Sequence, residues 1–418
     1  MIDGLIYDWN AVTVSRRPGP VMLDDETLRD GLQSPSVRSP SIEDKLRILH
    51  LIDTLGIHTA DIGLPGAGPD VARDAERLAR EIVSARLSVA ANCAARTHVD
   101  DIRPVAEIQQ RTGLPIECCC FIGSSPIRQY AEGWTLDWLL RKTEDAITFA
   151  VREGLRVMYV TEDTTRAHPD TLRALYRCAI RAGASRICVA DTVGYATPAG
   201  AAAVVRFAAS VIAESGTPVG IDWHGHRDRD LAVACSLAAY EEGATRLHGA
   251  ALGIGERVGN TPMDLLLVNL VLLGHLQRGL LPLADYCETV SRACGVPIPD
   301  NYPVLGRDAF RTATGVHAAA VVKAAKKGDR ALMDLVYSAI PAGLVGREQE
   351  IEIGPMSGRS NVTYWLEKRG LVATESLVDW IFQKAKRASA VLTDAEIQAE
   401  ISAAAGATVD APTRVAKD

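Results

Sequence analysis

Four residues of this chain have side chains that could together hold a divalent metal ion. They are Asp30, which follows Arg29, the two histidines of His224-Gly-His226, and Asn260. In a β-strand, residues i and i+2 face the same side, so His224 and His226 on one strand can present two imidazoles to a single ion. With a carboxylate and an amide oxygen they make a mixed oxygen and nitrogen site. Such a site suits Mg²⁺, Mn²⁺ or Zn²⁺ and leaves positions open for a substrate.

The open positions imply a Lewis-acid role. A 2-oxo acid is a natural bidentate ligand, because it offers a carboxylate and a keto oxygen, and the ion would polarise its carbonyl for attack. Arg29 would hold a permanent positive charge beside that oxygen and stabilise an enolate or alkoxide. Two histidines at a strand end can also be ordinary hydrogen-bonded residues; the presence of Asp30 and Asn260 favours the metal site. His248 has no such company and is interpreted as structural.

These residues can meet only if the chain forms a closed barrel. Short β-branched or apolar runs recur about every thirty residues, each followed by a longer amphipathic stretch, which is typical of βα units around a parallel sheet. Eight units over roughly 250 residues predict an α/β fold, a (β/α)8 TIM barrel rather than an open doubly wound sheet. The predicted strand runs are Pro20–Glu26, Thr59–Pro65, Leu87–Cys93, Ile116–Ile122, Arg156–Asp163, Arg186–Thr192, Val219–His226 and Thr245–Gly253.

Helical spacing of apolar residues fills the gaps between these runs, as in Ser41–Leu55, Asp137–Glu153 and Asp170–Ala182. Active sites of such barrels lie at the carboxyl ends of the strands. In a closed barrel the first strand neighbours the eighth. We therefore expect Asp30 after strand one, the histidines on strand seven and Asn260 after strand eight to converge on one centre.

The pattern changes after about residue 281, where proline-containing connections lead into a helical region, Thr314–Lys327. This change predicts a smaller C-terminal helical or α+β subdomain region, and the last residues are small and polar, as in a disordered tail. The predicted divisions are an N-terminal extension over residues 1–19, a catalytic TIM barrel over 20–281, C-terminal subdomains over 282–405 and a disordered tail over 406–418.

Composition excludes several classes of protein. The chain has 418 residues, 47% of them hydrophobic, and a formal net charge of −7. No long block of Lys and Arg could follow a nucleic-acid backbone; the short basic run Lys323–Arg330 is either a solvated helix face or a contact for an anionic cofactor tail. No apolar stretch is long enough to span a membrane, and the N-terminus lacks the features of a signal peptide. We therefore expect a cytoplasmic protein.

The nine cysteines, an odd number, indicate reduced thiols rather than a disulfide framework. The run Cys118-Cys119-Cys120 could suggest a metal site. Strand alternation would point Cys119 away from its two neighbours, however, and free cysteine packs as a small hydrophobe, so core packing is favoured.

The motifs carry a resemblance to a known family. Asp25–Gln33, Glu162–Arg166, Asp191–Pro198, His224–His226 and Gly253–Asn260, in this order, resemble the isopropylmalate, homocitrate and citramalate synthases, which are metal-dependent barrel acyltransferases related to HMG-CoA lyases. The resemblance spans roughly residues 21–280. It implies a Claisen-type condensation of acetyl-CoA with a 2-oxo acid, followed by thioester hydrolysis, to give a 2-substituted malate.

The resemblance also assigns roles to individual residues. Asp30, His224 and His226 match the family's metal ligands, with Asn260 at or near the ion. The matched catalytic residues are Arg29 for the oxyanion, Glu162 for enolisation of acetyl-CoA, His317 in a Ser-Gly-Ile-His-like segment, and Tyr337. The matched or candidate substrate-binding residues are Arg96, Ser125, Arg128 and Thr197. Arg96 and Arg128 are possible contacts for a substrate carboxylate, and a surface or loop ion pair is the alternative for Arg128. In the family the C-terminal segments reach the neighbouring subunit's barrel, which implies a homodimer.

The sequence departs from the family pattern at several positions. Leu32 stands where the synthases usually carry Glu, and it gives the sequence Arg-Asp-Gly-Leu-Gln that is found in HMG-CoA lyases. Asp61 replaces a residue that is usually Glu in the family, and Thr312 replaces a residue that is often His. A metal-dependent lyase or aldolase of the HMG-CoA lyase type is therefore the alternative function, although Gly253–Asn260 follows the synthase pattern. A non-catalytic metal-binding protein is disfavoured by the presence of Arg29, Glu162 and His317 alongside the ligands. The residues after 404 are too few for the regulatory domain of the long synthases, so no leucine-type feedback inhibition is expected.

Overall fold

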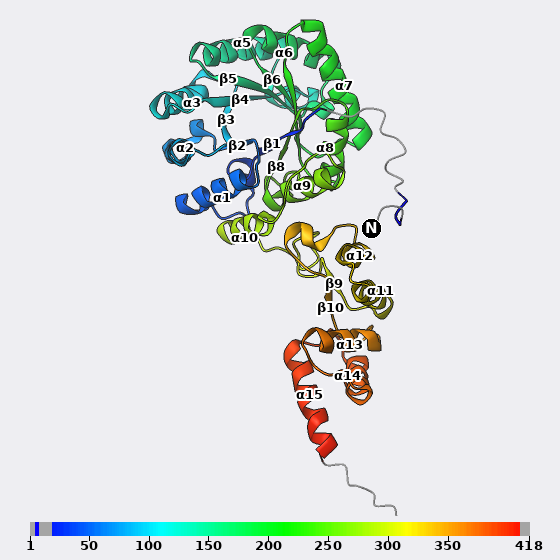
Figure 1. Cartoon of the computed structure of the whole chain (residues 1–418). Helices are drawn as coiled ribbons and strands as arrows, with labels where there is room; N and C mark the ends of the chain where they lie inside the picture. Colours follow the sequence, from blue (N-terminus) through cyan, green and yellow to red (C-terminus); the bar gives the residue numbers. More distant parts are fainter. Residues whose placement is uncertain (1–4, 8–18, 410–418) are drawn as a thin grey trace, which may run out of the picture. The chain divides into compact units, whose positions relative to one another are not determined.

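The computed structural model describes residues 5–7 and 19–409 of the chain, and its central feature is a closed barrel of parallel strands, as predicted. Eight strands follow one another around the barrel in chain order, and β1 pairs in parallel with both β2 and β8, which closes the sheet (Figure 1). The strands are β1 (Met22–Asp25), β2 (Thr59–Asp61), β3 (Ala90–Arg96), β4 (Ile116–Gly123), β5 (Arg156–Glu162), β6 (Arg186–Asp191), β7 (Gly220–Gly225) and β8 (Arg246–Gly249). Each of the eight predicted runs contains or overlaps one of them.

Helices surround the barrel: α1 to α8 lie between consecutive strands, and α9 and α10 follow β8 (Figure 1). They are α1 (Ile42–Thr54), α2 (Pro69–Ala85), α3 (Val99–Thr112), α4 (Pro126–Glu132), α5 (Leu136–Arg152), α6 (Pro169–Ala182), α7 (Pro198–Ser215), α8 (Ala232–Glu241), α9 (Met263–Leu272) and α10 (Leu283–Cys294). Short 3-10 turns follow several strands at their carboxyl ends: η2 (Asp30–Gln33), η3 (Pro65–Ala67), η4 (Thr164–Arg166) and η5 (Ala251–Gly253).

Local sequence signals explain where the predicted helices begin. The side chain of Ser41 accepts a hydrogen bond from Asp44 N and caps α1, and Thr135 caps α5 by accepting from Trp138 N. A side-chain acceptor at this position satisfies one of the free N–H groups of the first helical turn. The three helices predicted from apolar spacing are α1, α5 and α6, and all three are confirmed.

The run of three cysteines obeys strand alternation. Cys118 and Cys120 lie on one face of β4, with their sulfur atoms 3.6 Å apart, while Cys119 faces the barrel interior. All nine cysteines of the chain carry free thiols and are buried. The prediction of reduced, packed cysteines is thus confirmed.

The described part of the chain divides into two compact units, the first within residues 10–298 and the second within residues 1–9 and 299–418. The division lies at residue 298 rather than at 281, where the prolines had placed it. Pro282 does not end the barrel unit; it stands at the N-cap position of α10, whose residues Tyr286 and Val290 are fully buried. The hydroxyl of Tyr286 hydrogen-bonds to Asp25 and Thr27, which ties α10 to the end of β1.

The second unit is mainly helical, with one two-stranded parallel sheet, which matches the predicted α+β character. The predicted helix Thr314–Lys327 is α11, and a small core around Trp365 and Ile381 joins α13 and α14. Its elements are β9 (Arg311–Thr312), α11 (Gly315–Lys326), α12 (Arg330–Leu335), η6 (Ala342–Val345), β10 (Glu350–Ile351), α13 (Arg359–Lys368), α14 (Glu375–Arg387) and α15 (Asp394–Val409).

The predicted terminal segments fall mostly outside the described residues. Most of the N-terminal extension and residues 410–418 of the predicted tail are not among the residues that the structure describes. Helix α15 continues to Val409 and therefore extends into residues 406–418, which were predicted to be a disordered tail. Within the described residues, no helix has the length and apolar character required to cross a membrane.

Candidate metal centre and active site

Asp30, His224 and His226 direct their metal-binding atoms at one small volume at the carboxyl end of the barrel. The Nε2 atom of His224 lies 3.2 Å from Asp30 Oδ2 and 3.3 Å from His226 Nε2, and the distance from His226 Nε2 to Asp30 Oδ2 is 3.5 Å. All three residues are buried. Because β1 and β7 both flank β8, closure of the barrel brings these atoms together, as the sequence analysis expected.

Asn260 adds an oxygen next to this cluster. It forms an isolated antiparallel bridge with His226, and its Nδ2 donates to the carbonyl of Ile254 at 3.0 Å. Its Oδ1 atom is buried and accepts no hydrogen bond from any described residue, and His226 Nδ1 is also buried without a partner there. Buried polar atoms are almost always satisfied. A cation at the centre would provide the missing partner for the amide oxygen, so the donor set fits a divalent metal ion.

Two glycines allow the loop between η5 and Asn260 to fold this tightly. A Cβ atom on Gly255, whose φ is +141°, would lie 2.2 Å from Asn260 Nδ2. A Cβ atom on Gly259, whose φ is +107°, would lie 1.7 Å from the carbonyl oxygen of Gly253. Any side chain at either position would displace backbone or the amide, so the glycines are required to hold Asn260 in place.

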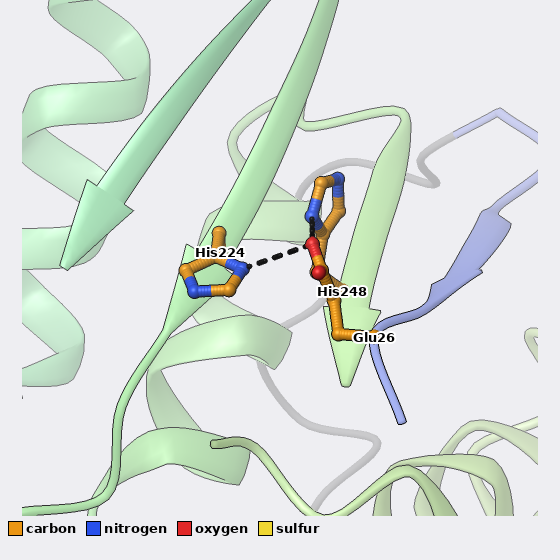
Figure 2. Close-up of side chains that lie close together, drawn as sticks. All are labelled: Glu26, His224 and His248. Carbon is orange, nitrogen blue, oxygen red and sulfur yellow. Dashed lines mark hydrogen bonds and ion pairs between the residues drawn. The ribbon is translucent and has the colours of Figure 1, made fainter. Parts of the chain in front are cut away.

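A second carboxylate orients His224 from behind. Glu26 Oε1 lies 3.4 Å from His224 Nδ1 and 2.9 Å from His248 Nδ1. Figure 2 shows the Glu26 carboxylate between the two imidazole rings, with one oxygen directed at a nitrogen of each. His224 therefore presents Nε2 to Asp30 and Nδ1 to Glu26, the arrangement by which a carboxylate fixes the orientation and tautomer of a metal-binding histidine.

His248 connects Glu26 to a charged layer deeper in the barrel. Its Nε2 lies 3.0 Å from Asp222 Oδ2, and Asp222 also accepts from Arg246. Burial opposes a charge on this imidazole, but the carboxylates of Asp24, Asp222 and Glu26 raise its pKa to about 10. His248 is thus an imidazolium that donates to carboxylates on two sides, which suits a supporting role rather than a ligand role. In contrast to His248, burial lowers the pKa of His226 to about 4, so its ring is neutral and able to bind a cation.

Arg29 lies beside the cluster and is held by three acids. Its Nε donates to Asp61 Oδ2 at 2.8 Å, its Nη2 pairs with Glu26, and its Nη1 lies 3.4 Å from Asp30 Oδ2. Burial opposes the charge of this guanidinium, yet the surrounding carboxylates hold its pKa well above the usual value. A fixed positive charge therefore stands next to the candidate metal position, as the sequence analysis expected.

A cavity of about 330 Å³ opens above the cluster. Glu162, at the end of β5, lines it, and burial raises the pKa of its carboxyl group above the usual range. A carboxylate with a raised pKa is a stronger base than an exposed one. The polar residues that line the cavity are Glu26, Arg29, Asp30, Gln33, Glu162, Thr192, His224, His226, His248, Glu256 and Arg257.

The four candidate substrate residues are not among the residues that line this cavity. Arg96 is mostly exposed and pairs with Asp101 in the first turn of α3, with Nε to Oδ2 at 2.6 Å. Arg128 is half exposed, and its Nη1 donates to Glu132 Oε1 at 2.8 Å along α4. Its charge still acts on Glu162, whose pKa it lowers against the effect of burial.

Ser125 and Thr197 both serve as helix caps. The fully buried Ser125 hydroxyl bonds to Asp163 and accepts from Arg128 N at the start of α4. The Thr197 hydroxyl accepts from Gly200 N at 3.2 Å at the start of α7. These contacts account for a hydroxyl residue at both positions without a substrate.

His317 and Tyr337 belong to the second unit and lie against each other. Their rings stack with centroids 4.2 Å apart and an interplanar angle of 27°. His317 is in the first turn of α11, and both residues are exposed. The two residues matched from separate segments of the C-terminal region are thus brought together by the fold of that unit.

Glu26 was not predicted from the sequence, and His248, which was predicted to have no partners at the site, contacts Glu26 and Asp222. A signal for Glu26 was present: Asp24 and Glu26 are two residues apart at the end of β1, so both face the barrel interior where the ligands lie. Glu256 and Arg257, which also line the cavity, sit in the Gly253–Asn260 segment that was considered only for Asn260.

Comparisons with known proteins agree with this geometry. A model of the family described as HMGL-like matches residues 21–290. The chain is 31% identical over 373 residues to a probable 2-isopropylmalate synthase of Methanopyrus kandleri, covering 88% of this chain and 70% of that protein. It is 32% identical over 383 residues to the homocitrate synthase AksA of the same organism, covering 91% of this chain and 90% of that protein.

The fold resembles that of solved lyases. The structure of an HMG-CoA lyase from Bacillus subtilis matches with a TM-score of 0.56 and 20% sequence identity, covering 68% of this chain and 96% of that chain. At this identity the likeness concerns the barrel fold alone.

Proposed function

The chain belongs to the HMGL-like family, and from this premise we propose that it is an acyltransferase that condenses acetyl-CoA with a 2-oxo acid and hydrolyses the resulting thioester. The printed names of the matched relatives, isopropylmalate and homocitrate synthases, support this type of reaction. The observation that carries the proposal is the convergence of Asp30, His224, His226 and the unpartnered Asn260 Oδ1 on a cavity that also contains Arg29 and Glu162.

The balanced reaction consumes acetyl-CoA, a 2-oxo acid and water, and it releases a 2-substituted malate, CoA and a proton. A divalent ion held by Asp30, His224, His226 and Asn260 would supply Lewis-acid polarisation of the keto group. The carbon–carbon bond forms between the acetyl methyl carbon and the keto carbon. Attack of water on the thioester carbonyl then breaks the carbon–sulfur bond.

Glu162 is proposed as the group that removes a proton from the acetyl methyl carbon. Its carboxylate lines the cavity at the end of β5, across the barrel from the ligand cluster, and burial keeps its pKa elevated. A base whose pKa lies near the working pH transfers protons most effectively. Arg29 is proposed to stabilise the negative charge that develops on the former keto oxygen, since its guanidinium is fixed beside Asp30.

The second unit is proposed to supply His317 and Tyr337 to the reaction. They form one exposed stacked pair, so they can reach a substrate as a unit. By resemblance to the synthases, we propose a cytoplasmic homodimer in which this pair completes the barrel site of the neighbouring subunit.

The experiment that tests the function is CoA release from acetyl-CoA by the full chain with Mg²⁺ or Mn²⁺ and a panel of 2-oxo acids. We expect release that depends on one class of acid and stops when a chelator is added. Asp30→Ala should lose both bound metal and turnover. Arg29→Ala should retain metal and lose turnover, because its charge acts on the developing oxyanion and not on the ion.

Silence with every acid on the panel would contradict the proposal. Cleavage of a 3-hydroxyacyl-CoA or a 4-hydroxy-2-oxo acid by the same preparation would then identify the alternative, a lyase or aldolase. Near-normal turnover by Arg29→Ala would remove only the oxyanion role.

A further inference from the structure

The cavity of the barrel has two chemically different walls. The polar wall is formed by residues at the ends of β7, β8 and β1, among them His224, His248 and Glu26. The opposite wall is formed by β3 to β6 and is apolar below the level of Glu162. Ala190 on β6 is paired in register with His224 on β7, so the apolar wall begins directly beside a candidate metal ligand.

The apolar wall is built from small and soft side chains. Cys119, Met158 and Cys188 form one buried cluster, and Val160 packs against it. Strand alternation turns these residues inward together, because Met158, Val160 and Glu162 are two residues apart along β5. The apolar wall comprises Ala94, Cys119, Phe121, Met158, Val160 and Ala190, with their neighbours.

The charges around the cavity disfavour a second carboxylate on the substrate. The described residues that line it include four carboxylates, two guanidinium groups and the His248 imidazolium, an excess of one negative charge. One divalent ion and the substrate's own carboxylate bring this sum to zero, so a second carboxylate would add a charge that nothing neutralises. Arg29 is engaged by Asp61 and Glu26, and Arg257 holds Asp228 through two bonds of 2.8 Å. The carboxylate next to the keto group would bind at the metal position. A second, distal carboxylate would find no unpaired cation among the described lining residues.

Two nearby arginines are also committed. Arg246 touches the apolar wall from below, with Nη2 3.2 Å from Met158 Sδ, but it is buried and bonded to Asp222 and Glu117. Arg128, the other candidate for a distal carboxylate, pairs with Glu132 and does not line the cavity. Neither arginine is placed to receive an anionic tail.

We propose that the 2-oxo acid used by this protein carries an uncharged, apolar substituent, aliphatic or aromatic, which lies against the wall formed by β3 to β6. The inference rests on the proposed function for the orientation of the acid, with its carboxylate and keto group at the metal centre. Apart from Leu64, which follows β2, the apolar residues among the described lining residues all belong to this wall. An apolar pocket of this kind gains roughly tenfold or more in affinity for each well-packed methylene.

The test uses two acids of matched shape. 5-Methyl-2-oxohexanoate replaces the distal carboxylate of 2-oxoglutarate with an isopropyl group and keeps the rest of the chain. Dissociation constants for both are measured by calorimetry with the full chain and Mn²⁺, and pyruvate serves as the acid without a long substituent. We expect the apolar acid to bind at least about tenfold more tightly than 2-oxoglutarate and than pyruvate.

Variants connect the preference to the wall. Met158→Gln should weaken binding of the apolar acid about tenfold and leave Mn²⁺ and pyruvate binding unchanged. Met158→Leu, which keeps an apolar side chain, should bind the apolar acid as the unaltered chain does. The same exchange at the exposed Met356 is the matched control. Val160→Thr, which adds a hydroxyl at nearly constant volume, serves if Met158→Gln does not fold.

Equal binding of the two acids, tighter binding of 2-oxoglutarate, or no binding of the apolar acid would overturn the inference. Loss of 2-oxoglutarate binding in Arg128→Gln would then assign the distal carboxylate to that residue. The two proposals fail separately: an apolar preference without CoA release contradicts the function alone, and CoA release with 2-oxoglutarate alone contradicts the substrate class.

Discussion

At the scale of single residues, His224 illustrates how the site is supported. One ring nitrogen faces Asp30 and the other faces Glu26, so the imidazole has a defined orientation before any ion binds. Glu26 in turn accepts from His248. Glu26 and His248 therefore fix the orientation of His224 without serving as metal ligands themselves.

This chain of contacts predicts the effect of His248→Leu. The change removes the donor to Glu26 and leaves two buried carboxylates, Glu26 and Asp222, without that partner, so metal affinity should fall about tenfold or more. Mn²⁺ titration followed by electron paramagnetic resonance measures the change. His275→Leu, which alters a histidine packed on Tyr240, is the control and should bind Mn²⁺ as the unaltered chain does. Equal affinities in the two variants would show that His248 has no positioning role.

The ligand residues could be predicted from the sequence because simple rules connect them. Strand alternation joins His224 to His226, and barrel closure joins Asp30 to strand seven across strand eight. The positions of Arg96 and Arg128 could not be predicted in this way. Their ion-pair partners, Asp101 and Glu132, lie in the helices that follow the strands. The four-residue spacing of Arg128 and Glu132 is typical of neighbours on a helix, but strand alternation does not indicate that either ion pair forms.

At the scale of elements, the contact between β1 and α10 explains the position of the unit boundary. A proline-rich stretch often marks the end of a domain, but Pro282 occupies the helix start, where its missing N–H is harmless. The long-range bond from Tyr286 to Asp25 then attaches α10 to the barrel. The sequence predicted every barrel strand from local pattern, whereas this boundary depends on a contact between residues far apart in the chain.

The same contact predicts a pH-dependent loss of stability in Tyr286→Phe. Burial raises the pKa of Asp25 to about 7, and the hydroxyl of Tyr286 opposes that rise. Because the folded-state pKa lies above the ordinary value, stability falls as pH rises through about 7, when the buried carboxylate becomes charged. Removing the hydroxyl should destabilise the fold by roughly 1–3 kcal/mol, with the larger loss at pH 8 and the smaller at pH 5.

Urea unfolding at the two pH values measures this loss. Tyr159→Phe is the control, because the Tyr159 hydroxyl bonds to Thr143 and not to a carboxylate. Its loss of stability should be the same at both pH values. An equal loss at both values in Tyr286→Phe would contradict a charged Asp25 as the origin of the effect.

At the scale of the whole molecule, the proposed catalytic residues are divided between two units. Asp30 and Glu162 belong to residues 10–298, and His317 and Tyr337 belong to the unit that contains residues 299–418. The proposed homodimer explains this division if the pair from one subunit serves the barrel of the other.

Subunit mixing tests the arrangement. Asp30→Ala and His317→Ala should each be inactive alone. In a mixed dimer, one barrel retains Asp30 and receives the intact His317 of the other chain, so random mixing should restore about one quarter of the normal activity. Activity that stays at zero after the two proteins exchange subunits would place His317 with the barrel of its own chain or outside the reaction.

Because the cavity has two different walls, a mutation can change the choice of 2-oxo acid without changing metal binding. Every candidate ligand lies on, or just beyond, β1, β7 and β8, whereas the surface proposed to contact the substituent lies on β3 to β6. A single exchange at Ala94 or Met158 could thus alter which acid is accepted without disturbing the ion. Divergence of specificity within one chemistry then requires few steps, and directed evolution of new condensations can be confined to four strands.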